Sequence, residues 1–162
     1  MTLGFLASEL VVSPFGSGVR AAPRPEAKTP AAVPTIVINE MDYHPVDDNP
    51  AGEFIELYNT AATTIDMSGW TFSGIDYTFP PGSSMAPGAY LTLTPATYGG
   101  GLSNGGERIR IKDSGGNVID QVTYSDSLDW PAMADGKGES LQRRVATSSG
   151  DNPGNWVSAD PT

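Results

Sequence analysis

Two runs of alternating residues joined by a short polar turn constrain this chain more than any other feature. The runs are residues 107–112 and 118–124, and the turn between them, 113–117, reads DSGGN. In the first run Ile109 and Ile111 share one face, because successive side chains of a strand point to opposite sides of a sheet. This pattern predicts a β-hairpin with one buried face and one solvated face.

Short runs of the same kind recur along the chain from Thr35 onward. Further strands are predicted at residues 35–40, 53–59, 65–72, 89–94 and 140–144. Turns rich in Gly and Pro separate them, and no long stretch has the apolar spacing of a helix. The predicted fold class is therefore all-β, an antiparallel β-sandwich whose two sheets close over a shared core.

Residues 1–34 differ in composition from the rest of the chain, since they are rich in Ala, Pro and Gly. Such a segment favours a disordered leader, so we expect a leader at 1–34 and one β-sandwich domain at 35–162. The apolar run within residues 1–22 fits either a degenerate signal peptide or a plain leader, because Glu9 and Pro14 interrupt it. No apolar run reaches the roughly 18 residues of a transmembrane span.

The charge balance excludes some classes of partner. The formal net charge is −10, and from Thr35 onward 17 acidic residues face six basic ones. Such a field repels phosphate groups, so neither nucleic acid nor an anionic membrane surface is an expected partner. The chain contains no cysteine, which rules out disulfides and thiolate chemistry.

Residues 101–105, GLSNG, have the G-x-S-x-G spelling of a hydrolase nucleophile elbow. That elbow requires a strand before the serine and a helix after it, whereas here glycines precede Ser103 and a strand follows. The single histidine, His44, would have to be the base. We expect an ordinary glycine-rich loop and a histidine without a catalytic task.

Glu40 and Asp42 form a second candidate for acid–base chemistry. Two residues apart on one strand face, they would lie about 7 Å apart, within the range of a glycosidase pair. A solvated strand face explains the same two carboxylates.

Acidic loops make calcium the better chemical hypothesis, because Ca²⁺ prefers carboxylate and carbonyl oxygens. The candidates come from three loops and are Asp47, Asp48, Asp126 and Asp135. The first loop begins like an EF-hand but has Tyr58 where the twelfth-position glutamate should stand. A merely acidic surface is the alternative, and no other cofactor is expected.

Asp120 interrupts the apolar face of the strand at 118–124, where it shares a side with Val118 and Val122. Either the strand is covered on both sides, or Asp120 points inward and needs hydrogen-bond partners, since an unpaired buried carboxylate is very unfavourable. We predict a paired structural role.

The three tryptophans allow two interpretations. Trp70, Trp130 and Trp156 could form a platform for sugars, or they could fill the core of the sandwich. Gly69, inside a predicted strand, indicates a bend that would aim Trp70 inward. Exposure of Trp130 beside the Asp126 loop would favour carbohydrate binding.

Six motifs, taken in order, resemble the lamin tail domain in the form found in bacterial exported proteins. They are INE (38–40), EFIELYN (53–59), DMSGW (66–70), LSNGGERIRIKD (102–113), VIDQVTY (118–124) and WPAMADGKGESLQ (130–142). The resemblance implies an immunoglobulin-like sandwich and a non-enzymatic module, of the kind attached to secreted hydrolases, nucleases or surface proteins.

The function expected on this basis is a non-catalytic interaction or targeting module of a secreted or cell-surface protein. Its partner would be a protein or a surface polysaccharide. The alternative is a carbohydrate-binding module, with or without help from calcium.

Overall fold

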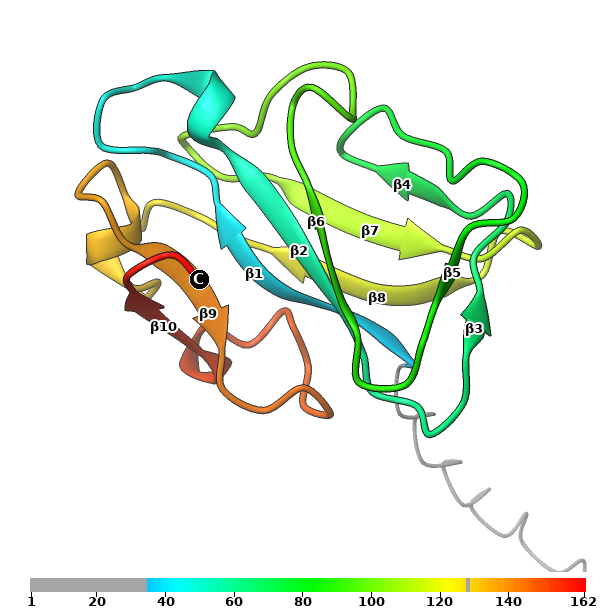
Figure 1. The fold of residues 1–162 in the computed structure, drawn as a ribbon. Coiled ribbons are helices and arrows are strands. Elements are labelled where there is room, and N and C mark those ends of the chain that lie inside the picture. Colours follow the sequence, from blue (N-terminus) through cyan, green and yellow to red (C-terminus); the bar gives the residue numbers. More distant parts are fainter. Residues whose placement is uncertain (1–34, 128) are drawn as a thin grey trace, which may run out of the picture. The chain divides into compact units, whose positions relative to one another are not determined.

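The predicted hairpin is present in the computed structural model, which describes residues 35–127 and 129–162 (Figure 1). Strand β7 (Arg108–Lys112) pairs antiparallel with β8 (Val118–Thr123). In the turn, the Asp113 carboxylate accepts hydrogen bonds from two backbone N–H groups at 2.9 and 2.8 Å. Such local bonds hold a tight turn, and so they fix the register of the two strands.

The larger of the sheets has five strands and contains the first and the last strand of the domain. In spatial order they are β10 (Trp156–Ala159), β9 (Ser140–Arg143), β1 (Ile36–Asp42), β2 (Phe54–Asn59) and β6 (Tyr90–Leu93). Every pair in this sheet is antiparallel.

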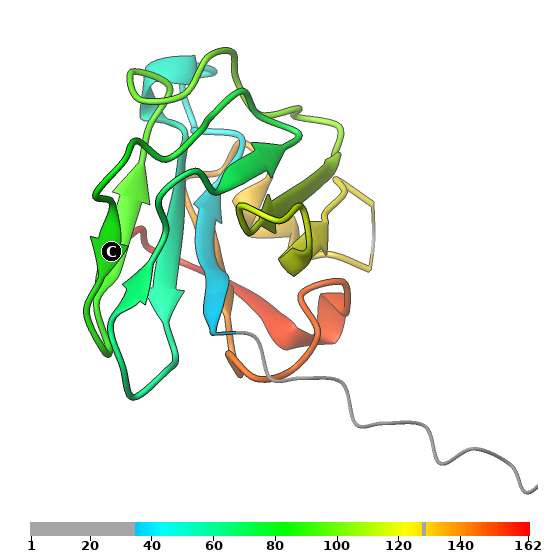
Figure 2. The ribbon, with the colours of Figure 1, turned by 90° about the vertical axis from the view of Figure 1, so that its right-hand side faces the viewer.

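The second layer is a three-stranded sheet in which β4 (Thr71–Ser73) lies beside β7 and β8. Figure 2 shows this layer across from β1, β2 and β6. A small ribbon of β3 (Ile65–Asp66) and β5 (Ser84–Met85) is the remaining sheet. The helical elements in the described part of the chain are single 3-10 turns: η1 (Pro50–Gly52), η2 (Ala132–Ala134) and η3 (Pro153–Asn155).

The core lies between the two layers and confirms the all-β antiparallel sandwich. Ile38 and Leu57 from the larger sheet and Ile109 and Val122 from the smaller one are fully buried. They occupy the inward positions that strand alternation assigns to them.

The predicted strand at 65–72 is divided in the structure. β3 and β4 belong to different sheets, and the chain turns between them at Gly69, whose φ is +72°. The Gly69 N–H donates to the Phe79 carbonyl at 3.0 Å, and Trp70 is only 7% exposed. The prediction of a bend that aims Trp70 inward is therefore confirmed.

Two short strands, β5 and β10, have no counterpart among the predicted elements. Both lack a clear alternation of apolar and polar residues, so pairing alone reveals them. The predicted leader, residues 1–34, lies outside the described residues. In the part of the chain that is described, no helix has the length and hydropathy needed to cross a membrane.

Candidate functional site

A β-bulge in β1 places the polar groups of the candidate site. Ile38 pairs with Leu57 and Glu40 pairs with Glu56, so Asn39 is the extra residue between them. One extra residue shifts the alternation of side chains, which turns Glu40 from the core side to the outer face of the five-stranded sheet. Asn39 and Glu40 therefore both project outward, next to Glu56.

On the inner side of the bulge, Asp120 and Arg143 form a buried ion pair. Arg143 Nη1 donates to Asp120 Oδ2 at 2.5 Å and to the Ile38 carbonyl at 3.0 Å, while Asp120 accepts from the Ile38 N–H at 2.9 Å. Burial raises the pKa of Asp120, and the bonds to Arg143 and Ile38 act in the opposite direction. The prediction that Asp120 is paired is confirmed, and its contribution to stability stays a prediction.

Glu40 and Asp42 do not form the solvated strand face that alternation allowed. Glu40 is 1% exposed and Asp42 is 6% exposed. Glu40 accepts hydrogen bonds from the Ser140 hydroxyl at 2.6 Å, from Gln142 Nε2 at 3.3 Å, and from the N–H and the hydroxyl of Thr162. Both of its oxygens are therefore engaged, which leaves it poorly placed for acid–base chemistry.

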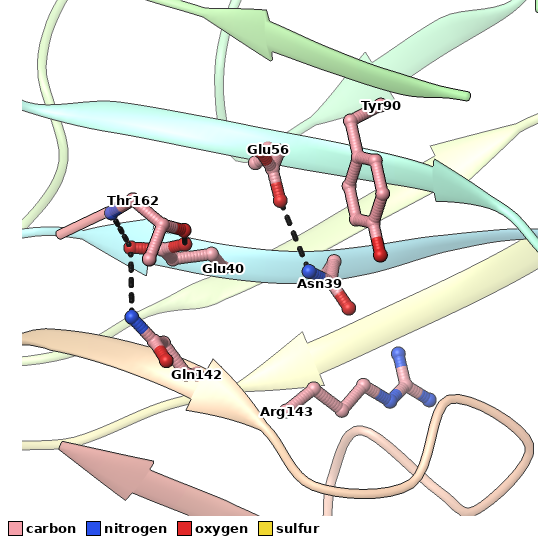
Figure 3. A pocket seen from close by; sticks show the side chains of 7 residues that line it. All are labelled: Asn39, Glu40, Glu56, Tyr90, Gln142, Arg143 and Thr162. Carbon is pink, nitrogen blue, oxygen red and sulfur yellow. Dashed lines mark hydrogen bonds between the residues drawn. The ribbon is translucent and has the colours of Figure 1, made fainter. Parts of the chain in front are cut away.

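A pocket of about 370 Å³ opens on the outer face beside these groups (Figure 3). Its volume lies at the small end of the range for ligand-binding cavities. The lining residues come from four strands and the end of the chain, and they are Asn39, Glu40, Glu56, Tyr90, Gln142, Arg143 and Thr162.

Of the two side-chain carboxylates in this pocket, Glu56 accepts fewer hydrogen bonds than Glu40. It is 8% exposed, and one of its oxygens accepts from Asn39 Nδ2 at 3.0 Å. Burial raises its pKa, and the neighbouring charge of Glu40 adds to the rise. Within the described residues its other oxygen has no hydrogen-bond partner.

Tyr90 lines the pocket on the side of β6, and the ring of Tyr58 stacks against it. Tyr58 and Tyr90 face each other across β2 and β6, with ring centroids 4.6 Å apart and planes inclined by 24°. Tyr90 is 59% exposed, so one face of a supported aromatic ring meets solvent.

Two of the calcium candidates lie at the ring of His44. His44 Nδ1 is 2.7 Å from Asp135 and Nε2 is 2.6 Å from Asp48. These hydrogen bonds, with Asp135 the stronger influence, raise the pKa of His44. The histidine thus links the loop after β1 to the loop before β9.

The other two candidates, Asp47 and Asp126, are not brought to that histidine. Asp47 accepts the N–H of Asn49 and Asp126 accepts the hydroxyl of Ser125. Within residues 35–127 and 129–162, no group of three or more His, Cys, Asp or Glu side chains is arranged so that it could hold a metal ion. Calcium binding by these loops stays a prediction.

Ser103 and His44 do not form a catalytic pair. Both ring nitrogens of His44 lie at carboxylates, as described above. The Ser103 backbone N–H donates to Glu107 at 2.9 Å, and its carbonyl accepts from the Tyr124 hydroxyl at 2.9 Å. The G-x-S-x-G segment is a loop held by these bonds, as expected.

The tryptophans belong to the core and do not form an exposed platform. Trp70 and Trp130 are 7% exposed and Trp156 is 2% exposed. The rings of Trp130 and Trp156 lie 6.2 Å apart, and Trp156 Nε1 donates to the Gly150 carbonyl at 2.8 Å. The exposure of Trp130 that would favour sugar binding is absent, and among the aromatic residues that the structure describes Tyr90 is the exposed one.

The stability of the domain is expected to fall as the pH rises from 5 to 8. Burial raises the pKa of Asp42 from 3.8 to about 6, with Glu53 and Glu40 adding to the rise. The native state binds this proton more tightly than the unfolded chain, so stability falls as pH rises through about 6. The raised pKa of His44 has the same sign: its contribution is complete below about pH 6.5 and is lost above that.

Chemical unfolding at several pH values checks this expectation. Asp42→Asn should flatten the lower part of the profile and raise the unfolding free energy at pH 7 by up to about 2 kcal/mol. His44→Gln should flatten the upper part, and the exposed Asp76→Asn should leave the profile unchanged. A parent domain that becomes more stable between pH 5 and pH 8 would contradict it.

Sequence reasoning did not identify the residues that line the pocket as a group. Within residues 53–59, alternation puts Glu56 and Tyr58 on one face, and within residues 89–94 it puts Tyr90 on the face opposite Leu91 and Leu93. The order of the strands brings these faces together, and the bulge at Asn39 completes the group. Neither feature can be predicted from a single sequence.

Comparison with known proteins agrees with this architecture. The family model described as Lamin Tail Domain matches residues 29–126, which is more than half of the chain. Searches of curated proteins and of solved structures found no match. The match ends before β9 and β10, although these strands complete the larger sheet. With its immunoglobulin-like β-sandwich, the chain belongs to the lamin tail domain family.

Proposed function

We propose that the chain is a non-catalytic interaction or targeting module of an exported or cell-surface protein. Membership of a family of immunoglobulin-like domains supports the role of a module. The fold itself does not specify a function, so the proposal depends on the site.

The observation that carries the proposal is the pocket on the outer sheet face. It combines an exposed tyrosine, Tyr90, with a carboxylate, Glu56, that has an oxygen without a partner in the described part of the chain. By contrast, the groups that a hydrolase would need, His44 and Glu40, have their polar atoms engaged in the framework. A surface of this kind is suited to binding without turnover.

The partner is a protein or a surface polysaccharide rather than nucleic acid. The domain carries 17 acidic residues against six basic ones from Thr35 onward, which disfavours contact with phosphate groups. The chain contains no cysteine, so its fold requires no disulfide and no oxidising compartment. This composition is compatible with export.

Carbohydrate binding is the second candidate, and the Tyr58–Tyr90 pair favours it. A ring that is held flat against another ring and exposed on its other face is a stacking surface for the apolar side of a sugar. The amide and carboxylate groups beside it would accept hydrogen bonds from hydroxyls.

Binding assays with the labelled full chain test the proposal. We expect saturable binding to a component of an arrayed set of surface glycans and extracellular proteins, with that component chemically unchanged afterwards. Tyr90→Ala should weaken this binding about tenfold, because it removes the exposed ring. Val118→Ala, which shortens an exposed side chain on the other sheet, is the matched control. Release of cleavage products, or binding insensitive to Tyr90→Ala, would contradict the proposal.

A further inference from the structure

Thr162 donates two hydrogen bonds to Glu40, a carboxylate of this pocket, and so shows one arrangement of donors that such a carboxylate accepts. Its N–H donates to Glu40 Oε1 at 3.1 Å and its hydroxyl donates to Glu40 Oε2 at 2.5 Å. The nitrogen and the hydroxyl oxygen of threonine are attached to adjacent carbons. One carboxylate thus holds a neighbouring N–H and O–H pair with both of its oxygens, and a 2-amino sugar carries the same pair on its ring.

Several polar groups of the pocket still have bonding capacity in the part of the chain that the structure describes. They are the second oxygen of Glu56, the amide oxygens of Asn39 and Gln142, and the hydroxyl of Tyr90. Glu56 is more than nine-tenths buried and lies at the pocket in Figure 3, opposite Glu40 on the neighbouring strand. Three of the four groups can only accept hydrogen bonds, so a ligand that fits them must supply donors.

The charge of the pocket selects among such ligands. Glu40 and Glu56 supply its two side-chain carboxylates. Arg143 is the basic residue of the lining: its two Nη atoms bind Asp120 on the inner side of the sheet, and its Nε, which has no hydrogen-bond partner among the described residues, is buried. The pocket therefore attracts an ammonium group and repels the carboxylate of an acidic sugar. Tyr90, exposed beside these groups, offers its ring face to the C–H groups of a sugar.

We propose that this pocket binds a 2-amino sugar whose amine is free. The ammonium group and its neighbouring hydroxyl bind Glu56, as the N–H and hydroxyl of Thr162 bind Glu40, and the sugar ring lies on Tyr90. Asn39 and Gln142 accept from the remaining hydroxyls. This assignment rests on the proposed function of a binding module and specifies the class of its ligand.

Calorimetric titration of the full chain with three hexasaccharides tests the assignment. The probes are the glucosamine hexamer, the N-acetylglucosamine hexamer and cellohexaose, which have the same linkage and differ at the C2 substituent. At a pH where the amine is protonated and the carboxylates are ionised, we expect the glucosamine hexamer to bind at least about tenfold more tightly than the other two. A charge-assisted hydrogen bond to a buried carboxylate accounts for a factor of that size.

Variants separate the roles of the residues. Glu56→Gln keeps the shape of the side chain and should weaken the glucosamine hexamer about tenfold, with little effect on cellohexaose. Tyr90→Ala should weaken all three sugars. Asp76→Asn, which removes an exposed charge outside the pocket, should change none of them.

Other outcomes overturn the assignment in ways that can be told apart. Equal affinity for the three hexamers, or an equal effect of Asp76→Asn and Glu56→Gln, would show that no specific amine site exists. Equally tight binding of Nα-acetyl-lysine amide would assign the pocket to a lysine side chain of a protein. If the chain binds another glycan or protein through Tyr90 and none of these sugars, the amino-sugar assignment fails and the interaction module stands. If nothing binds, both fail.

Discussion

Replacement of Arg143 with methionine is expected to lower the free energy of unfolding by about 3–5 kcal/mol. The change leaves Asp120 as a buried charge without its partner and removes the donor to the Ile38 carbonyl. A further carbonyl, that of Ser148, loses the donor it has in Arg143 Nη2. Urea unfolding followed by fluorescence measures the difference, which is large beside the roughly 5–15 kcal/mol of a typical domain.

A double variant keeps this prediction informative even if Arg143→Met does not fold. Asp120→Leu combined with Arg143→Met removes both charges, and we expect it to recover at least half of the lost stability. Recovery should be incomplete, because the N–H and carbonyl of Ile38 stay without these partners. Arg108→Met, at an exposed position of β7, is the control and should change stability by less than about 0.5 kcal/mol. A single variant as stable as the parent would show that the pair contributes nothing.

Replacement of Trp156 with alanine should lower the free energy of unfolding by a similar amount, about 3–5 kcal/mol. The indole is 2% exposed, lies 6.2 Å from the ring of Trp130, and has the guanidinium carbon of Arg143 5.9 Å from its ring centroid. It also donates a hydrogen bond to Gly150. The variant therefore creates a cavity and leaves a buried carbonyl without its donor.

This prediction tests whether the last strand is an integral part of the domain, although it lies beyond the family match. Val157→Ala, on the same strand but only partly buried, is the control and should lower the unfolding free energy by no more than about 1 kcal/mol. Trp156→Phe keeps an aromatic ring, so its loss of unfolding free energy should lie between those of Val157→Ala and Trp156→Ala. A loss below 1 kcal/mol for Trp156→Ala would mean that β10 adds little to the fold.

Most of the framework could be predicted from the sequence, because it depends on local patterns. The alternation around Ile109 and the DSGGN turn identified the hairpin, and the break at Gly69 predicted the inward turn of Trp70. The sequence also indicated that Asp120 needs a partner. It did not identify Arg143, 23 residues further along the chain, because strand order is not a local property.

The candidate site could not be predicted for the same reason. Alternation without a bulge assigns Asn39 and Glu40 to opposite faces, whereas the extra residue places both on the outer face. Glu40 was expected in solvent on one interpretation, but the hydroxyl of Ser140 and the two donors of Thr162 cover it. A contact between residues 100 or more positions apart leaves no trace in a single sequence.

The pairing of β1 with β9 has a consequence for biosynthesis. Glu40 contacts Ser140 across a separation of 100 residues, so β1, the central strand of the larger sheet, cannot pair on this side until β9 has been synthesised. Closing so long a loop is slow, and the nascent chain cannot complete the larger sheet before β9 has been synthesised. Until then one edge of β1 is unpaired. An unpaired edge allows neighbouring nascent chains to associate, and it is a binding site for a holdase chaperone.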